Sequence, residues 1–174
     1  KEELKKLTDI DVETDKLIFY LPTMRKGLKD EGEQFENNIF NYPDYDADQI
    51  DQFLEANHAY IFAKVHFADN EFFKGENVKL PKRMIFLDTD ILNKNFLTIY
   101  HVMNGFDALI TDYSSVYVDF LLLDKPIIFS CPELAKYQAD RGVIVEDPKL
   151  LMPGPVVGTQ DKLFEILGDI LAGR

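Results

Sequence analysis

The sequence is most informative in the stretch Asp107-Ala-Leu-Ile-Thr-Asp-Tyr-Ser-Ser-Val-Tyr-Val-Asp-Phe-Leu-Leu-Leu-Asp-Lys-Pro-Ile-Ile-Phe129. Residues 108–110 form a short apolar run that suits a buried strand, and residues 111–115 form a polar turn rich in hydroxyls. Residues 116–123 are compatible with a helix, and Pro126 begins a second extended run. The stretch therefore predicts a strand, a turn, a helix and a strand, which is the order of a phosphate-binding βαβ unit.

Two interpretations of this turn remain open. The unpaired N–H groups of a helix N-terminus attract an anion, and the hydroxyls of Thr111, Ser114 and Ser115 can donate further hydrogen bonds to a phosphate. Alternatively, Ser114 or Ser115 caps the helix and Asp112 favours its first turn with no ligand present. Asp112 could also orient Ser115 or hold a metal ion through a diphosphate, but a single acid does not make a metal site.

Strands and helices are expected to alternate along the rest of the chain. Strands are predicted near residues 17–21, 59–65, 83–87, 107–110, 126–130 and 143–145, and helices near 46–57, 94–104, 114–123, 132–138 and 160–171. This alternation predicts an α/β fold with a doubly wound, Rossmann-like parallel sheet. The 174 residues suit one domain, so we take residues 1–174 as a single domain.

Three further segments have a predicted role in the organisation of the chain. The charged stretch Lys1 to Leu7 is helix-like and suits a connector from an upstream part, so we expect a fragment of a larger enzyme. Residues 26–44 form a long irregular loop, which is either a lid or a surface excursion. Residues 153–155, Pro-Gly-Pro, are too short for a linker and predict a rigid turn.

Composition excludes several classes of function. The net charge is −12, with 19 basic against 31 acidic residues, and the pI is near 4.6. No basic stripe is present, which argues against a nucleic-acid partner. The single cysteine, Cys131, excludes an internal disulfide framework and a cysteine-based zinc cluster. No apolar run approaches the roughly 20 residues of a membrane span, so a soluble, cytoplasmic protein is expected.

Polar side chains follow three of the predicted strands. Thr23 and Arg25 follow the first strand, His66 follows the second, and residues 111–115 follow the fourth. Ligands of an open parallel sheet bind beyond the carboxyl ends of its strands, so these groups are expected to converge on one site. A histidine there can donate to a phosphate oxygen and, when protonated, offset charge on a leaving phosphate.

Two other charged residues have both a ligand and a structural interpretation. Arg141 could bind a phosphate with two hydrogen bonds, or it could pair with a neighbouring acid such as Asp140. Glu133 could reach a ribose hydroxyl, or it could simply occupy the first turn of a helix, where an acid is favourable without any ligand. Neither residue alone decides between these interpretations.

Several motifs resemble those of the CDP-glycerol glycerophosphotransferases, the teichoic-acid polymerases and primases. The resemblance is carried by Leu109-Ile-Thr-Asp-Tyr-Ser-Ser115 with the following Asp-Phe and Lys-Pro-Ile-Ile-Phe. It is supported by Pro22-Thr-Met-Arg25, Ala63-Lys-Val-His66 and, near the end, Tyr137, Arg141-Gly142 and Met152-Pro-Gly-Pro-Val-Val157. The sequence departs from the family pattern at Met24, where an aromatic residue is usual, and at Lys64, where an arginine is expected. Lysine keeps the charge but loses two-pronged phosphate recognition.

The resemblance implies one half of a GT-B-type transferase, namely the C-terminal half that binds CDP-glycerol. The implied reaction transfers glycerol phosphate to a hydroxyl of a glycerol-phosphate polymer or its linkage unit and releases CMP. The resemblance implies His66 as a catalytic residue, and the following residues as donor-binding: Thr23, Arg25, Lys64, Thr111, Asp112, Ser114, Ser115, Glu133 and Arg141.

The same resemblance sets expectations for what lies outside this chain. The N-terminal acceptor half, which supplies the general base in a His-Gly-Thr motif, is expected to be missing, because that motif does not occur here. The full-length protein is expected at the cytoplasmic face of the membrane. No cofactor is expected, and the need for a divalent ion is left open.

Two rival functions are retained. One is a transferase that uses CDP-ribitol or a nucleotide sugar, because recognition of a diphosphate is indifferent to the group attached beyond it. The other is a non-catalytic, nucleotide-binding regulatory module, which the departures at Met24 and Lys64 keep open.

Overall fold

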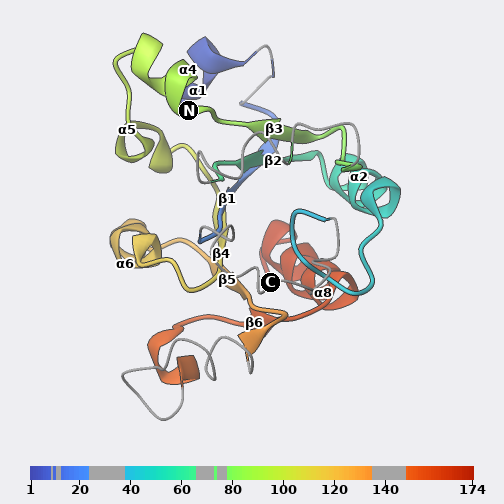
Figure 1. Cartoon of the computed structure of the whole chain (residues 1–174). Coiled ribbons are helices and arrows are strands. Elements are labelled where there is room, and N and C mark those ends of the chain that lie inside the picture. Colours follow the sequence, from blue (N-terminus) through green and yellow to red (C-terminus); the bar gives the residue numbers. More distant parts are fainter. Residues whose placement is uncertain (9, 11–12, 24–37, 66–72, 74–77, 135–147) are drawn as a thin grey trace, which may run out of the picture.

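The computed structural model describes residues 1–8, 10, 13–23, 38–65, 73, 78–134 and 148–174. The described strands form one parallel sheet in the order β3-β2-β1-β4-β5-β6 (Figure 1). They are β1 (Lys16–Leu21), β2 (Ala59–Ala63), β3 (Met84–Phe86), β4 (Ala108–Thr111), β5 (Ile127–Ser130) and β6 (Val156–Val157). Their parallel pairing confirms the predicted α/β sheet.

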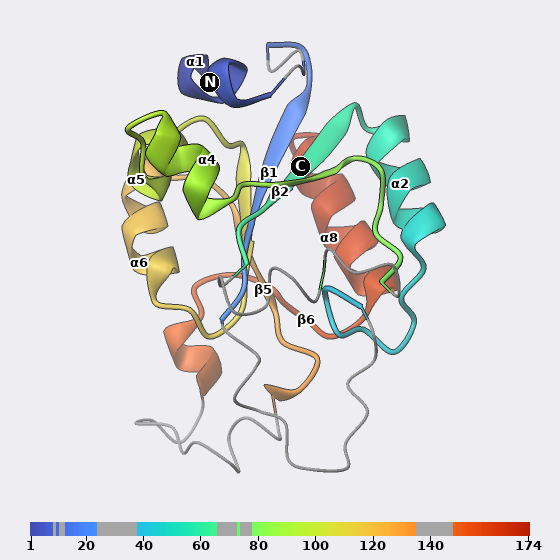
Figure 2. The same ribbon diagram turned by 45° about the horizontal axis from the view of Figure 1, so that its top comes forward.

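Helices cover both faces of the sheet (Figures 1 and 2). The helices α1, α4, α5 and α6 lie on one face, and α2 and α8 lie on the other, which is the doubly wound arrangement. The bounds are α1 (Glu2–Leu7), α2 (Ala47–Ala56), α4 (Thr89–Lys94), α5 (Ile99–Met103), α6 (Val116–Phe120) and α8 (Gln160–Leu171), with 3₁₀ turns at η1 (Leu121–Leu123) and η2 (Pro148–Leu151).

The central strand β1 shows why this sheet needs helices on both sides. Leu17 and Phe19 pack under the face that carries α5 and α6, whereas Ile18 and Tyr20 pack under α2 and α8. All four side chains are fully buried. A strand that is apolar at successive positions cannot leave either face in water, so a continuous apolar run predicts a parallel strand covered on both faces.

Five of the six predicted strands and two long helices agree with the structure within one or two residues. The helix predicted at 94–104 is wrong as a single element, because the chain breaks between α4 and α5. Phe96 has a left-handed φ of 56°, and Thr98 begins α5 with a capping box in which its backbone N–H donates to His101 Nδ1. The spacing of apolar residues suggested one continuous helix, although the chain changes direction between α4 and α5. Thr98, a residue type that often caps a helix, was the sequence signal for this break.

The end of the sheet differs from the prediction. Val156 and Val157 form the short strand β6 against β5, whereas only a rigid turn was expected nearby. A two-residue strand has no periodicity that a sequence could show. The strand predicted at 143–145 lies outside the described residues, as does most of the helix predicted at 132–138.

The structure describes the N-terminal segment and part of the long loop that the sequence analysis singled out. The expected helix at Lys1–Leu7 forms as α1 and is docked on the domain, since Leu4 is fully buried in the core under α5. Of the loop predicted at 26–44 as a lid or a surface excursion, residues 38–44 are described and are anchored to the sheet, whereas residues 26–37 lie outside the described residues. Tyr20 Oη donates to Ile39 O at 2.9 Å, and Tyr42 Oη lies 2.7 Å from Ser130 Oγ.

Gly154 explains the predicted rigid turn before β6. A Cβ atom at this position would lie 2.3 Å from the backbone oxygen of Ile127, which is far inside van der Waals contact. The Pro-Gly-Pro turn therefore approaches the start of β5 so closely that only glycine fits. This contact lets Pro155 O accept from Phe129 N at 2.8 Å and sets β6 beside β5.

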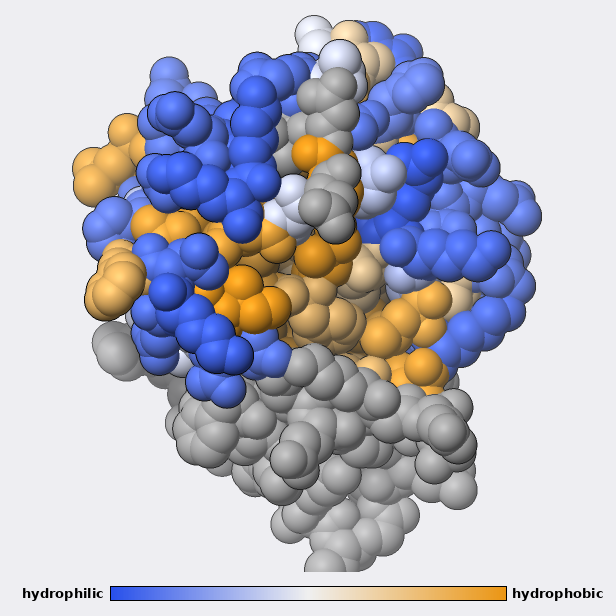
Figure 3. Space-filling view, turned by 90° about the horizontal axis from the view of Figure 1, so that it is seen from above, coloured by the Kyte–Doolittle hydropathy of each residue, from blue (hydrophilic) through white to orange (hydrophobic). Residues whose placement is uncertain are grey.

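Figure 3 views the molecule from above, onto the side of the sheet where β3 is the outermost strand. Apolar surface lies in a band between hydrophilic flanks formed by helices. The β3 residues Ile85 and Phe86 are only partly buried, as expected for a short edge strand.

Candidate functional site

The sheet order locates a topological switch point between β1 and β4. The chain proceeds from β1 outward to β2 and β3, and then returns to place β4, β5 and β6 on the other side of β1. Connections therefore leave the two central strands in opposite directions. In open α/β sheets, ligands bind in the crevice that forms at the carboxyl ends of two such strands. These ends point toward the lower part of Figure 2.

Asp112 joins the two loops that border this crevice. Its side chain is only 3% exposed. Oδ1 accepts from Thr23 N at 2.8 Å, from Thr23 Oγ1 and from Ser114 N at 3.2 Å, and Oδ2 accepts from Thr23 N at 3.0 Å. The structure thus brings together Thr23, Asp112 and Ser114, which the sequence had placed at the ends of two strands.

Ser114 and Ser115 stand at the start of α6. Ser114 is partly buried and Ser115 is exposed. Ser115 is the N-cap residue, but its backbone is helical (φ −64°, ψ −9°) and its side chain makes no capping hydrogen bond to α6. The structural interpretation of Ser115 as a side-chain cap is therefore wrong, and the residue is exposed at the carboxyl edge.

Thr111 lies beneath the site. It is fully buried, and its Oγ1 donates to Leu21 O at 2.7 Å. The hydroxyl therefore ties the end of β4 to the end of β1, and its predicted hydrogen bond to a phosphate does not fit this position. The reason is that Thr111 is still inside β4, one residue before the turn begins.

Lys64 follows β2 at the same edge. Its Nζ donates to Thr89 Oγ1 at 2.9 Å, so it reaches toward the start of α4. Desolvation lowers the pKa of Lys64, and the nearby Asp88 carboxylate opposes that shift. Sequence analysis missed Asp88 and Thr89, although they follow β3 as Thr23 follows β1, and this repeated position was the available signal.

Glu133 lies close to the same corner, beyond β5. Burial raises the pKa of Tyr113 above its usual range, and the Cys131 thiol, Asp112 and Glu133 raise it further. The Tyr113 hydroxyl therefore stays protonated at physiological pH. Because Cys131 and Glu133 act on the side chain next to Asp112, the segments that follow β4 and β5 lie side by side.

The N-termini of α2 and α8 reach the same edge but are occupied by the chain itself. Asp46 caps α2 by accepting from Asp48 N and Gln49 N at 2.9 and 3.1 Å. Asp44 accepts from Gln160 N and Asp161 N at 2.8 and 3.1 Å at the start of α8. These carboxylates already satisfy the N–H groups that an anion would need.

Three predicted site residues, Arg25, His66 and Arg141, lie outside the described residues, as does Tyr137. Their predicted roles are therefore untested. In the described part of the chain, no cluster of three His, Cys, Asp or Glu side chains has the arrangement of a metal site. Among the same residues, no helix is long and apolar enough to cross a membrane.

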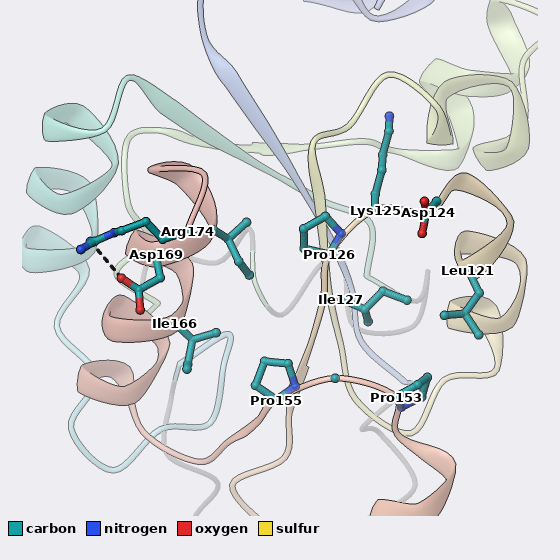
Figure 4. A pocket seen from close by; sticks show the side chains of 12 residues that line it. Leu121, Asp124, Lys125, Pro126, Ile127, Pro153, Pro155, Ile166, Asp169 and Arg174 are labelled. Carbon is teal, nitrogen blue, oxygen red and sulfur yellow. Dashed lines mark ion pairs between the residues drawn. The ribbon is translucent and has the colours of Figure 1, made fainter.

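A cavity of about 480 Å³ lies away from the carboxyl edge (Figure 4). Its walls are the turn before β5, the turn before β6 and the C-terminal half of α8, where Arg174 Nη2 pairs with Asp169 Oδ1 at 2.9 Å. Pro126, Pro153 and Pro155 line the side nearest the sheet. Since β5 and β6 begin there, this cavity belongs to the amino edge and is distinct from the candidate site.

Comparison with known proteins gives relatives over most of the chain. The teichoic acid glycerol-phosphate primase of Bacillus subtilis (strain 168) is 28% identical over 155 residues, covering 88% of this chain and 35% of that protein. The teichoic acid poly(ribitol-phosphate) polymerase of Bacillus spizizenii is 30% identical over 154 residues, covering 87% of this chain and 22% of that protein. The chain thus spans little more than a third of the first relative's length.

Solved structures share the fold. The wall teichoic acid polymerase TagF superimposes with a TM-score of 0.64 and 21% identity, covering 99% of this chain and 40% of TagF. This agrees with the predicted Rossmann-like fold. The family model for CDP-glycerol:poly(glycerophosphate) glycerophosphotransferase matches residues 1–173. The motifs at the carboxyl edge and this match over nearly the whole length show that the chain belongs to that glycerophosphotransferase family.

Proposed function

We propose that this chain is the single-domain, donor-binding part of a transferase that passes glycerol phosphate from CDP-glycerol to a hydroxyl of a teichoic-acid or related cell-envelope polymer. The family match over residues 1–173 carries the proposal. The crevice between β1 and β4 supports it, because the loops after both strands meet there through Asp112. A TagF structure obtained after a soak with CDPG has the same fold, with a TM-score of 0.67.

The proposed reaction is a displacement at phosphorus. An oxygen of the acceptor hydroxyl forms a bond to the β-phosphorus of CDP-glycerol, and the bond from that phosphorus to the bridging oxygen breaks. CMP leaves with the bonding electron pair, and the acceptor proton passes to a general base. Such transfers depend mainly on positioning and on stabilisation of charge on the phosphoryl oxygens.

The chain's own residues supply the donor side of this reaction. The exposed Ser115 hydroxyl and the partly buried Ser114 can donate to diphosphate oxygens at the crevice. Lys64 offers a cation at the neighbouring strand end, and Arg25, His66 and Arg141 remain proposed contacts from the family motifs. Without the His-Gly-Thr motif, the general base is proposed to lie in the part of the enzyme that this chain does not contain.

The membrane and acceptor side of the function is likewise a proposal. We place the full-length enzyme at the cytoplasmic face of the membrane, with the polymer acceptor held by the other half. We expect no CMP release at an enzyme-like rate when the 174-residue chain alone is given CDP-glycerol and acceptor. Turnover at such a rate would contradict the assignment of the base to another part of the protein.

A second donor has specific support. One relative, 30% identical, is a poly(ribitol-phosphate) polymerase, so CDP-ribitol is the alternative donor. Contacts to the diphosphate would be shared by both donors, and discrimination would come from contacts to the polyol. A nucleotide sugar has no such support among these relatives.

Calorimetric titration of the 174-residue chain tests the proposal. The ligands are CDP-glycerol, CDP-ribitol, CMP and UDP-glucose, and the variants are Ser114→Ala and Ser115→Ala. A hydrogen bond to a charged group is worth about 1.5–3 kcal/mol, so each variant should lose about tenfold or more in CDP-glycerol affinity.

The matched control is Thr14→Ala, which removes an exposed hydroxyl from the turn before β1, at the opposite edge. It should leave affinity unchanged. Tighter binding of CDP-ribitol than of CDP-glycerol would replace the proposed donor by the alternative. Binding of nucleotide with no loss in either serine variant would show that the site lies elsewhere on the chain.

A further inference from the structure

Asp112 has a geometry that suits the ordering of loops better than contact with a donor. Its carboxylate is an acceptor only, and its oxygens already accept three donors from Thr23 and Ser114. A phosphate offers acceptor oxygens and negative charge, so it has nothing to gain from this group directly. The side chain is also buried, so its charge requires those donors to remain in place.

The contacts of Asp112 lie just beyond the last paired residues of β1 and β4. The last paired residues of the central strands are Leu21 and Thr111. Beyond them the backbone ladder ends, and the carboxylate of Asp112 continues the connection as a brace between the loop at Thr23 and the turn at Ser114. Because the switch point lies between these two strands, the brace joins the two loops at the place where ligands of open α/β sheets bind.

We propose that Asp112 is a positioning residue that holds the Thr23 loop against the Ser114–Ser115 turn, so that the donor diphosphate meets groups that are already ordered. This inference rests on the proposed donor-binding function. Ordering the two loops before binding removes a conformational cost from the binding step, and the affinity rises accordingly. Asp112 itself does not touch the donor.

The opposite end of the same two strands provides a matched control. Asp107 precedes β4, and its Oδ2 accepts from Leu17 N at 2.8 Å, while its own N–H donates to Leu17 O at 2.7 Å. Asp107 and Asp112 are therefore two aspartates that brace the same pair of strands, one at the amino edge and one at the carboxyl edge. Only the second borders the crevice.

The experiment compares Asp112→Ala, Asp112→Asn and Asp107→Ala in the 174-residue chain. Each is titrated with CDP-glycerol at a temperature where urea unfolding shows the variant to be folded. We expect Asp112→Ala to weaken binding about tenfold or more, and Asp107→Ala to change it less than about twofold. Asp112→Asn, whose amide oxygen can replace Oδ1, should recover most of the affinity.

Amide hydrogen exchange provides the readout of position. Asp112→Ala should speed exchange at the Thr23 and Ser114 amides and leave Leu17 protected, whereas Asp107→Ala should do the reverse. Equal loss of CDP-glycerol affinity in the two alanine variants would overturn the inference, because it would show a general effect of stability. Unchanged binding in Asp112→Ala would overturn it as well.

Two outcomes need a separate readout. If Asp112→Ala does not fold, Thr23→Val can replace it, because this variant removes only one donor to the brace. Thr23→Val should still weaken binding several-fold, and Thr23→Ser is its control. Full affinity in Thr23→Val would overturn the inference. If the wild-type chain binds no CDP-linked donor, the proposed function fails. The exchange pattern then decides by itself whether Asp112 orders the two loops.

Discussion

An aspartate joins β1 and β4 at both the amino and the carboxyl end of the pair, but the surroundings of the two aspartates differ. At the amino end, Asp107 braces Leu17, and the neighbouring Gly105 and Gly154 permit backbone and apolar contacts that leave no room for a side chain. At the carboxyl end, Asp112 braces Thr23, and the neighbouring Ser115 hydroxyl stays exposed. The amino edge thus combines close backbone contacts at two glycines with the cavity beside α8, whereas the carboxyl edge is held by a buried carboxylate next to an exposed serine.

The difference follows from the direction of the elements. In a parallel sheet the helices begin at the carboxyl edge, so unpaired N–H groups gather there and polar residues are selected as their partners. Two of these N-termini, at α2 and α8, are satisfied by Asp46 and Asp44. The start of α6 has no such side-chain cap. Among the described helices that begin at this edge, α4 likewise has no side-chain cap, so α2 and α8 differ from α4 and α6 in having their N–H groups satisfied by the chain itself.

The largest effect is expected from Gly154→Ala at the amino edge. The new Cβ would meet the backbone oxygen of Ile127 at 2.3 Å, and neither backbone can yield cheaply. The free energy of unfolding should fall by about 2–3 kcal/mol in urea titrations. The control is Gly158→Ala, whose Cβ would lie 3.6 Å from Pro132, an ordinary contact. Equal stability of the two variants would contradict the close backbone contact between Gly154 and Ile127.

Thr111→Val tests whether the buried end of β4 belongs to the brace or to the ligand. The variant keeps the shape but loses the donor to Leu21 O, so the free energy of unfolding should fall by about 1.5 kcal/mol. Affinity for CDP-glycerol should stay within about twofold of the wild type. A loss as large as that of Ser115→Ala would return Thr111 to the binding residues and shift the boundary of the site into the strand.

Asp44→Ala tests whether α8 is closed to ligands. Loss of the acceptor for Gln160 N and Asp161 N should cost about 1 kcal/mol of unfolding free energy, with Asp44→Asn close to the wild type. Affinity for CMP, measured by calorimetry, should not change. Tighter binding of CMP to the alanine variant would reveal a second anion site and would remove the contrast between α6 and α8.

Lys64→Arg concerns the departure from the family pattern at the carboxyl edge. A planar guanidinium can donate two parallel hydrogen bonds to a phosphate, so CDP-glycerol should bind about threefold more tightly, a gain of less than about 1 kcal/mol. Lys82→Arg, at an exposed position before β3, is the control and should leave affinity unchanged. If both variants behave alike, Lys64 does not face the donor.

The smallest effect is a dependence of stability on pH. Desolvation lowers the pKa of Lys64 in the folded chain below its ordinary value. The folded state therefore releases its proton at lower pH than the unfolded state, and the stability of the wild type relative to Lys64→Met should rise as pH increases toward the ordinary lysine pKa of about 10.4. Urea unfolding of both proteins across this range measures the difference. A decrease with pH would contradict a desolvated Lys64.

Much of the fold could be predicted because its signals are local. Apolar runs such as Leu17 to Leu21 predict buried parallel strands, and the Thr-Asp-Tyr-Ser-Ser turn predicts a polar connection into α6. The errors occurred where local signals conflict or vanish. The period across Phe96 concealed a break between α4 and α5, and Val156–Val157 is too short to show a period.

The candidate site was predicted in part. Thr23, Asp112 and Ser114 meet as expected, but the Thr111 hydroxyl is buried and donates to Leu21 O. Asp88 and Thr89 lie beside Lys64, which was not expected. Whether a hydroxyl faces a ligand or a carbonyl depends on a single residue position along a strand. Sequence patterns do not fix a boundary that finely.

By itself, the sequence determined the fold class, the family and the edge of the sheet that bears the polar turns, because each depends on residue types in a short order along the chain. The tertiary structure alone decided the strand order, the meeting of Asp112 with Thr23, and the closing of α8 by Asp44. Those contacts join residues about 90 to 116 positions apart. Hydrogen bonds between such distant segments exist only after the sheet has brought them together, so no local pattern encodes them.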